Sequence, residues 1–138
     1  MKLTKKTRYG TRLLLDLAQY QAGGAVQMSE ISIRQNISVK YLEQIIRPLK
    51  KAKLVKSIRG PKGGHLLAKN PEKITLGDIT RLFEDQSELV DCISEPETCP
   101  KSDDCVVRLG WQQATIALYK ELDSISIANL LKRKNSIT

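Results

Sequence analysis

Three cysteines are the residues of this chain whose type and spacing most clearly predict chemistry. They stand at Cys92, Cys99 and Cys105, with six and then five residues between them. Pro96 and Pro100 stiffen this stretch, and thiolates on one short irregular segment can converge on a common centre without rearranging the fold. Thiolates are soft ligands that select zinc, copper(I) or an iron–sulfur cluster. The spacing therefore predicts a metal or cluster site in this segment.

The same three residues also allow other interpretations. Their number is odd and no secretion signal is recognisable, so a framework of structural disulfides is not expected. A closed zinc site usually takes a fourth Cys or His, and the single histidine, His65, is far away in the sequence. The remaining position could be filled by Asp91, Asp103, Asp104 or a residue of a partner subunit. Alternatively, the thiols could act in redox sensing or have no role.

Charge is distributed unevenly along the chain. Residues 1–70 hold 15 Lys and Arg against three Asp and Glu, a net charge of +12, whereas residues 71–138 carry a net charge of −4. A basic half is typical of a surface that meets a polyanion, although membranes also attract basic faces and such a surface can simply be solvated. No apolar run is long enough to span a membrane. We expect a cytoplasmic protein with a nucleic-acid partner and no membrane partner.

Apolar periodicity and turn residues indicate the elements that must position these residues. Helical spacing predicts helices over 5–21 and 29–35, and a third helix that begins at Ser38. Residues 54–59 and 65–68 are predicted to form the two strands of a hairpin, because a glycine-rich turn joins them. This order of elements is that of a winged helix-turn-helix.

The second half of the chain is predicted to be helical on both sides of the cysteine segment. Thr75 begins a capping pattern for a helix that ends near Glu84. A long helix with an apolar stripe is expected from about 104 to 122, and a short helix over 124–131.

The third helix and the hairpin supply the candidate contacts to DNA. A helix fits the major groove of B-DNA, and the side chains near its N-terminus reach base edges. Gln44 can bond an adenine edge in two places, and Glu43 can accept a hydrogen bond from cytosine. Lys and Arg side chains suit phosphates, which fix the register of the protein on DNA. The residues expected to contact DNA are Ser38, Lys40, Tyr41, Glu43, Gln44, Arg47, Arg59, Lys62, Gly63, Gly64 and His65.

Over residues 1 to about 131, the chain resembles the IscR/NsrR/CymR family of bacterial winged-helix transcription regulators, and its pattern is closest to the cluster-binding IscR-like members. The segment that begins the third helix carries the strongest similarity. The matching stretches are 1–3, 7–10, 37–45, 59–64, 76–79, the cysteine segment, Trp111 and 122–125.

This resemblance implies a homodimer, held by the long C-terminal helix, that places two winged helices on one double-stranded DNA operator. It implies that Cys92, Cys99 and Cys105 ligate an iron–sulfur cluster, with a 2Fe–2S cluster favoured over a 4Fe–4S cluster. It also links Glu43 to operator choice. The implied role is control of iron–sulfur biogenesis or of a redox or nitric-oxide response.

Three positions depart from the family pattern. Arg108 stands where the biogenesis regulators supply a histidine three residues after the last cysteine, and Arg8 stands where the nitric-oxide-sensing members supply an acidic ligand. His65 replaces the usual tyrosine that ends the wing, and a phosphate or groove contact is expected for it rather than metal binding. The fourth ligand therefore stays open. The alternative is a winged-helix regulator without a cluster, controlled by thiol oxidation or by a protein partner.

The expected fold class is mainly α with a small β-hairpin wing, as a winged helix-turn-helix plus a long C-terminal dimerisation helix. The chain is not expected to be an enzyme, since it lacks a nucleophile elbow, a phosphate-binding Gly-Lys-Ser/Thr loop and a His-Glu-x-x-His motif. The expected parts are a DNA-binding domain (1–84), a cysteine-bearing sensor loop (85–105), a dimerisation helix with a short C-terminal helix (106–131) and a tail (132–138).

Overall fold

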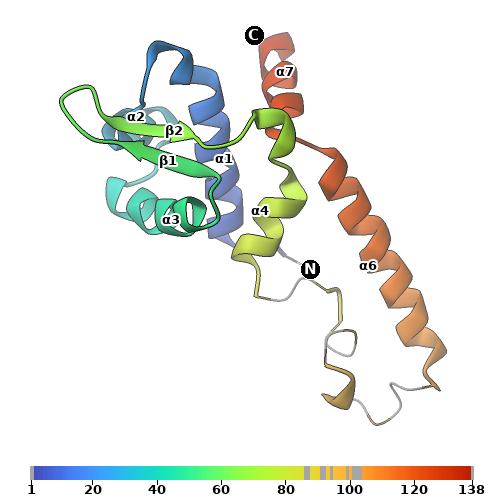
Figure 1. The fold of residues 1–138 in the computed structure, drawn as a ribbon. Helices are drawn as coiled ribbons and strands as arrows, with labels where there is room; N and C mark the ends of the chain where they lie inside the picture. The colour runs from blue at the N-terminus through green and yellow to red at the C-terminus, as the bar shows by residue number, and fades with distance from the viewer. Residues whose placement is uncertain are drawn as a thin grey trace.

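The computed structural model describes residues 2–85, 88–90, 93, 95–98, 100 and 104–137, so Cys92 and Cys99 lie outside the described residues. A body of helices and one hairpin carries a long helix, α6, that projects from it (Figure 1). The predicted fold class, mainly α with a winged helix-turn-helix, is confirmed. The elements are α1 (Lys5–Tyr20), α2 (Met28–Gln35), α3 (Val39–Lys51), β1 (Val55–Ile58), β2 (Gly64–Leu67), α4 (Leu76–Phe83), α6 (Val106–Ser124) and α7 (Ile127–Ile137), with 3-10 turns at Gln21–Gly23, Pro71–Lys73 and Pro96–Thr98.

The core of the winged domain lies where α3 crosses α1. Leu42, Ile45 and Leu49 of α3 are fully buried, as are Leu13 and Leu17 of α1. Burying a side chain of this size stabilises the fold by about 1.5–3 kcal/mol. The opposite face of α3 is left to solvent, so the core fixes which side chains this helix presents.

The turn between α2 and α3 is set by two polar residues. Asn36 adopts the left-handed conformation with φ 54°, which asparagine tolerates better than most residues. The Ser38 hydroxyl accepts a hydrogen bond from the Tyr41 N–H at 3.1 Å and caps α3, as the sequence predicts. Together they define the direction in which α3 leaves the turn.

The hairpin is antiparallel, and its second strand is bonded to the backbone at Val26. Ser57 pairs with His65 in the register of the two strands. His65 also exchanges two backbone hydrogen bonds with Val26, of 2.9 and 2.7 Å. A Cβ on Gly64 would lie 2.5 Å from the Val26 carbonyl oxygen, and Gly64 has φ +151°. Glycine is therefore required where the wing meets this backbone.

The C-terminal elements return to the winged domain. Thr75 and Asp78 form the predicted capping box of α4, with both hydrogen bonds at 3.1 Å. The Leu76 N–H donates to the Ile125 carbonyl and the Ile127 N–H donates to the Ile74 carbonyl, which anchors the end of α6 and the start of α7.

Helix α7 is longer than expected. It continues to Ile137, so the expectation of a tail from residue 132 is wrong for residues 132–137. Its first turn buries Ile127, and Lys134 donates to the Gln19 side chain of α1 at 2.5 Å. Packing on α1 extends a helix that its own sequence pattern ends near residue 131. Among the described residues, no helix is both long and apolar enough to cross a membrane.

Candidate DNA-binding interface and cysteine segment

The exposed face of α3 gathers most of the residues predicted to contact DNA. Because the α3 residues at 42, 45, 46 and 49 are buried, the intervening polar side chains point to solvent. The exposed set is Ser38, Lys40, Glu43, Gln44 and Arg47, and Tyr41 is half-buried beside it. A capped helix N-terminus with polar and cationic side chains can enter a DNA groove.

The wing supplies the other predicted contacts. Arg59 and Lys62 are exposed in the turn between β1 and β2. A Cβ on Gly63 would lie 2.3 Å from the Ile58 carbonyl oxygen, so a tight turn holds these cations close together. The wing can therefore present positive charge at a short distance from α3.

His65 lies in strand β2 rather than in the exposed turn of the wing. Its Nδ1 is 3.1 Å from the Ser57 hydroxyl. Burial, and then the nearby positive charge of Lys50, lower the pKa of His65. The imidazole is consequently held in its neutral form at neutral pH, and its predicted phosphate or groove contact stays a prediction.

The N-terminal end of α1 packs beside the start of α3, through residues that the sequence analysis does not single out. The ring of Tyr9 meets the ring of Tyr41 edge-on, with centroids 5.7 Å apart. The guanidinium carbons of Arg8 and Arg12 lie 5.7 and 5.4 Å from the Tyr9 ring centroid. The signal that could have found them is the Arg-Tyr pair with a second Arg one helical turn later, in the basic first helix.

A buried ion pair fixes α2 against α1. Asp16 is 0% exposed and accepts hydrogen bonds from Arg34 at 2.9 and 2.7 Å and from the Gln35 amide at 2.9 Å. The hydrogen bond to Asp16 raises the pKa of Arg34, and its guanidinium lies 3.9 Å from the ring centroid of Tyr20. Arg12 also donates to the backbone carbonyl and the side chain of Gln35. The helix-turn-helix is thus held as one unit.

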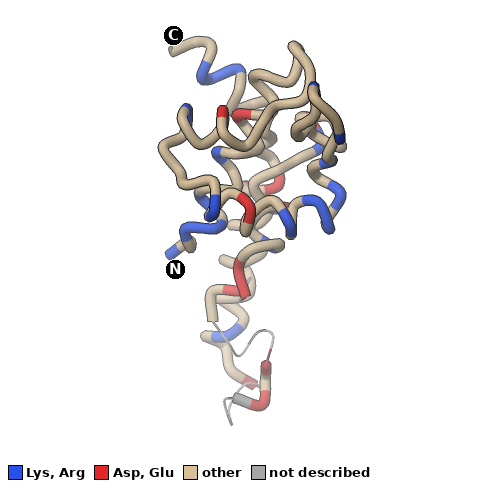
Figure 2. Tube along the Cα trace, turned by 90° about the vertical axis from the view of Figure 1, so that its left-hand side faces the viewer, with Lys and Arg blue, Asp and Glu red and all other residues tan. Residues whose placement is uncertain are grey.

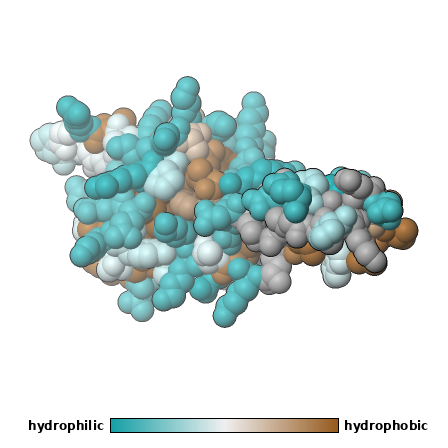
Figure 3. All heavy atoms as spheres, turned by 90° about the horizontal axis from the view of Figure 1, so that it is seen from below, coloured by the Kyte–Doolittle hydropathy of each residue, from teal (hydrophilic) through white to brown (hydrophobic). Residues whose placement is uncertain are grey.

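Charge separates between the body and the part that projects from it. Lys and Arg positions are spread over the winged body, whereas the projecting part carries mostly Asp and Glu (Figure 2). Seen from below, the body is largely hydrophilic with a small hydrophobic area, and hydrophobic atoms reappear at the far end of the projection (Figure 3). The body therefore suits a polyanion better than the projection does.

Of the three predicted cluster ligands, the structure describes Cys105. This residue is the N-cap of α6, is half-buried and free, and makes no side-chain capping hydrogen bond. Asp104 is exposed beside it. A thiol in this setting is accessible as a soft ligand, which fits a metal or iron–sulfur centre. The described residues alone contain no group of three potential ligands, and the predicted ligands Cys92 and Cys99 lie outside them.

A polar joint links α4 to α6 on the side of the winged domain. Arg81 donates two hydrogen bonds of 2.8 Å to Asp123, which raise the pKa of Arg81 and lower the pKa of Asp123. The Arg81 guanidinium lies 4.7 Å from the centroid of Tyr119. One helical turn earlier in α6, the Thr115 hydroxyl accepts a 3.3 Å hydrogen bond from the Leu89 N–H. The joint thus connects the segment that bears the cysteines with the winged domain.

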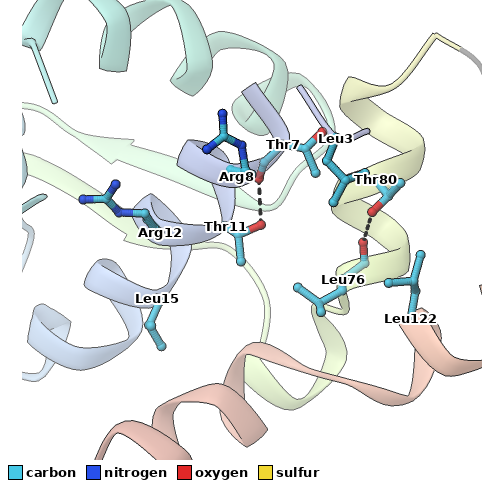
Figure 4. A pocket seen from close by; sticks show the side chains of 9 residues that line it. All are labelled: Leu3, Thr7, Arg8, Thr11, Arg12, Leu15, Leu76, Thr80 and Leu122. Atoms are coloured by element: carbon cyan, nitrogen blue, oxygen red, sulfur yellow. Dashed lines mark hydrogen bonds between the residues drawn. The ribbon is translucent and has the colours of Figure 1, made fainter. Parts of the chain in front are cut away.

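A cavity of about 270 Å³ opens between α1, α4 and the end of α6 (Figure 4). The hydroxyls of Thr11 and Thr80 donate to carbonyls of their own helices, both at 2.7 Å. The wall is therefore apolar, with arginines of α1 beside it. The lining residues include Leu3, Leu15, Leu76, Leu122, Arg8 and Arg12.

Helix α6 also leaves a large apolar surface uncovered. Five of its apolar side chains are between 47% and 80% exposed. Single exposed apolar residues are ordinary on a monomer, but a concentration on one helix marks an interaction site. These residues are Val106, Val107, Leu109, Trp111 and Ile116.

Comparisons with known proteins agree with this architecture. A profile of the Rrf2 family, described as an iron-dependent transcriptional regulator, matches residues 3–133. Protein rrf2 of Nitratidesulfovibrio vulgaris is 41% identical over 96% of this chain and 88% of its own length. The transcriptional regulator IscR of Sodalis glossinidius is 34% identical over 97% of this chain and 81% of its own length.

Solved structures give the same result. IscR of T. potens is 37% identical, covers 97% of this chain and 88% of its own, and superposes with a TM-score of 0.78. CymR, the global cysteine regulator of B. subtilis, is 33% identical, covers 96% and 98%, and has a TM-score of 0.79. The family and its IscR members are named as transcriptional regulators, in agreement with the prediction that the chain is not an enzyme. With a winged helix-turn-helix and these relatives, the chain belongs to the Rrf2 family of transcriptional regulators and is of the IscR/CymR type.

Proposed function

We propose that this chain is a dimeric regulator that binds a double-stranded DNA operator, and that an iron–sulfur cluster on Cys92, Cys99 and Cys105 modulates its operator affinity. The observation that carries the proposal is the capped, solvent-facing surface of α3, beside a wing that bears two exposed cations. The relatives named IscR support regulation through iron–sulfur chemistry, with a role in cluster biogenesis or in a redox or nitric-oxide response.

In this proposal α3 lies in the major groove and reads sequence with its first two turns. Gln44 bonds an adenine edge and Glu43 accepts a hydrogen bond from cytosine, which makes these two residues the determinants of operator choice. Lys40 and Arg47 on α3, with the exposed cations of the wing, bind phosphates on either side of the groove. Ser38 holds the helix N-terminus in place for these contacts.

Dimerisation is supported by the surfaces that the single chain leaves uncovered. The exposed apolar side chains of α6 lose contact with water when a second copy covers them. A dimer of winged helices reads two half-sites that lie about 34–36 Å apart, so the geometry of the α6 pair sets the spacing of the two recognition helices.

Cysteine coordination is supported by the position of Cys105 at the start of α6 and by the Cys spacing. When bound, an iron–sulfur centre supplies a group that responds to oxidants, to nitric oxide and to iron supply. The chain's own contribution is to tie the cysteine segment to α6, through Cys105 at its N-cap and Leu89 on Thr115. We favour a 2Fe–2S cluster over a 4Fe–4S cluster.

A second candidate is a winged-helix regulator without a cluster, controlled by thiol oxidation or by a protein partner. Its support is the likeness to CymR. CymR of Staphylococcus aureus has been solved in an oxidised form, with 34% identity to this chain, a TM-score of 0.73 and coverage of 95% and 96%.

The test is to purify the protein without oxygen, supply iron and sulfide, and record visible absorbance together with affinity for its own promoter region. The proposal expects cluster absorbance, salt-sensitive DNA binding and an affinity that changes when the cluster is removed. Replacing all three cysteines with alanine should abolish both the absorbance and that change. An affinity that responds to a thiol oxidant but not to iron and sulfide would instead favour the second candidate. Absence of salt-sensitive binding would overturn both.

A further inference from the structure

We infer that α1 carries a second DNA contact, in which Arg8 binds a backbone phosphate at the edge of the groove that α3 enters. This inference rests on the proposed function and extends the DNA surface beyond α3 and the wing. It assigns positioning roles to Tyr9 and Arg12, which hold this part of α1 beside the start of the recognition helix.

Tyr41 joins the start of α3 to helix α1. This residue lies in the first turn of α3, and its backbone N–H donates to the Ser38 hydroxyl that caps the helix. The ring of Tyr9 contacts the ring of Tyr41 at 5.7 Å with an interplanar angle of 85°. The segment of α1 around Tyr9 is therefore packed beside the end of α3 that enters the groove.

The N-terminal part of α1 carries positive charge. Arg8 is exposed, and in the part of the chain that the structure describes no carboxylate lies within ion-pair distance of it. Lys5 and Lys6 are exposed in the first turn of α1, which contains no acidic residue. Glu84 accepts a 2.7 Å hydrogen bond from the Thr4 N–H next to Lys5 and balances part of this charge, whereas the exposed Arg8 guanidinium suits a polyanion.

Arg8 and Arg12 differ in whether their guanidinium groups already have hydrogen-bond partners. Arg12 donates hydrogen bonds to the Gln35 side chain and carbonyl, at the end of α2. Its guanidinium is therefore used to hold the helix-turn-helix, whereas Arg8 keeps its donors for a ligand. Arg8 and Arg12 are four residues apart on one helix face, so both lie on the same side of α1.

The Arg8 side chain must be able to reach a phosphate that borders the groove. The major groove is about 12 Å wide, and the phosphates that border it flank the helix inside it. The contact of Tyr9 with Tyr41 puts this part of α1 beside the N-terminal end of α3, whereas the wing packs on α3 through β1. Arg8 can therefore bind a phosphate that borders the groove, in addition to those bound by Arg59 and Lys62 of the wing.

The experiment compares Arg8→Ala with Arg133→Ala in the full-length protein. Arg133 is exposed on α7, away from α3, and its replacement removes the same charge. Binding of each variant to the promoter fragment and to an unrelated duplex is measured at several salt concentrations. Loss of one phosphate contact lowers the slope of log affinity against log salt by about 1.

We expect Arg8→Ala to weaken binding about tenfold, because it removes one charge-assisted hydrogen bond to a phosphate. The loss should be equal on both duplexes, since a phosphate carries no sequence information. Arg133→Ala should keep the wild-type slope, and Arg8→Lys should recover most of it. Sedimentation velocity must show the same oligomeric state in all variants.

Three results would overturn the inference. The first is an Arg8→Ala slope equal to that of the wild type. The second is a loss confined to the promoter fragment. The third is a weaker dimer as the sole change, which would assign Arg8 to the cavity that it lines. If the wild-type protein itself bound DNA without salt dependence, the proposed function would fail as well, so the two failures are distinguishable.

Discussion

Two arginine–aspartate pairs with nearly the same geometry hold two different regions of this molecule. Arg34 meets Asp16 inside the winged domain at 2.9 and 2.7 Å, and Arg81 meets Asp123 at the joint of α4 and α6 at 2.8 Å. Their surroundings differ, because the Asp16 side chain is 0% exposed whereas Arg81 and Asp123 are 45% and 44% exposed. In the first pair the carboxylate is isolated from water and the Arg34 side chain is 28% exposed, whereas both partners of the second pair are exposed.

This difference indicates which region is built to stay fixed. An ion pair whose acid is buried is costly to break, since one charge is left without a partner away from water. An exposed pair contributes little and is easily exchanged for water and salt. The helix-turn-helix is therefore held in one arrangement, whereas the joint to α6 can change its arrangement at small cost.

The largest effect expected from this comparison is that of Arg34→Ala. It leaves the buried Asp16 with one hydrogen bond, from Gln35, and should lower the free energy of unfolding by about 3 kcal/mol. The matched variant Arg81→Ala should cost about 0.5 kcal/mol. Urea unfolding followed by far-UV circular dichroism measures both, and equal losses would contradict the comparison.

Gly77→Ala is expected to disturb the joint about as much as the loss of its ion pair does. A Cβ on Gly77 would lie 1.8 Å from the Asp123 carboxylate oxygen, so the Asp123 side chain must turn away from its place beside Arg81. Because the Asp123 side chain is 44% exposed and can move into water, the cost should be about that of an exposed ion pair, about 0.5 kcal/mol. Urea unfolding of Gly77→Ala beside Arg81→Ala measures it, and a loss as large as that of Arg34→Ala would contradict the comparison.

Tyr119→Phe tests whether the joint contains an unused hydrogen-bonding group. The Tyr119 side chain is 9% exposed, and its hydroxyl is buried with no hydrogen-bond partner among the residues that the structure describes. Removing an unsatisfied hydroxyl should leave stability unchanged or raise it by up to about 1 kcal/mol. A loss larger than that in thermal unfolding would show that the hydroxyl has a partner in the folded protein.

The smallest expected effects are those of pH on the free energy of unfolding. The winged domain and the joint should respond in different pH ranges. Burial lowers the pKa of His65 in the folded protein, so the unfolded chain binds more protons and stability falls as the pH drops below about 6.5. The hydrogen bond from Arg81 lowers the pKa of Asp123, so its contribution is lost only as the pH falls below about 3.8.

Unfolding measured from pH 8 to 3 should show both steps. His65→Gln should remove the loss of stability below about pH 6.5. Asp123→Asn should reduce the loss below about pH 3.8. An upper step that survives in His65→Gln would assign it to another group.

The winged domain could be predicted closely from the sequence because its signals are local. The Ser38 cap, the Thr75–Asp78 capping box and the glycine-rich wing each act within a few residues, and all are confirmed. The fold class and family follow from the same residues.

What the sequence did not predict depends on contacts between distant segments. Arg81 and Asp123 are 42 residues apart, and Tyr9 and Tyr41 meet only after α3 has packed on α1. Helix α7 ends later than its sequence pattern predicts, because contacts with α1, such as that of Lys134 with Gln19, extend it. Cys92 and Cys99 lie outside the described residues, so the ligand set is a proposal.

The anchoring of α6 at one end gives it the properties of a lever. Its 19 residues span about 28 Å at the usual rise of about 1.5 Å per residue. Backbone hydrogen bonds at Ile125 and Ile127 hold the pivot on the winged domain, and Cys105 occupies the opposite tip. A tilt of about 5° at the pivot moves the tip by about 2.5 Å over this length. Conversely, if a partner helix holds the middle of α6 in place, a displacement of that size at Cys105 would rotate the winged domain together with its recognition helix.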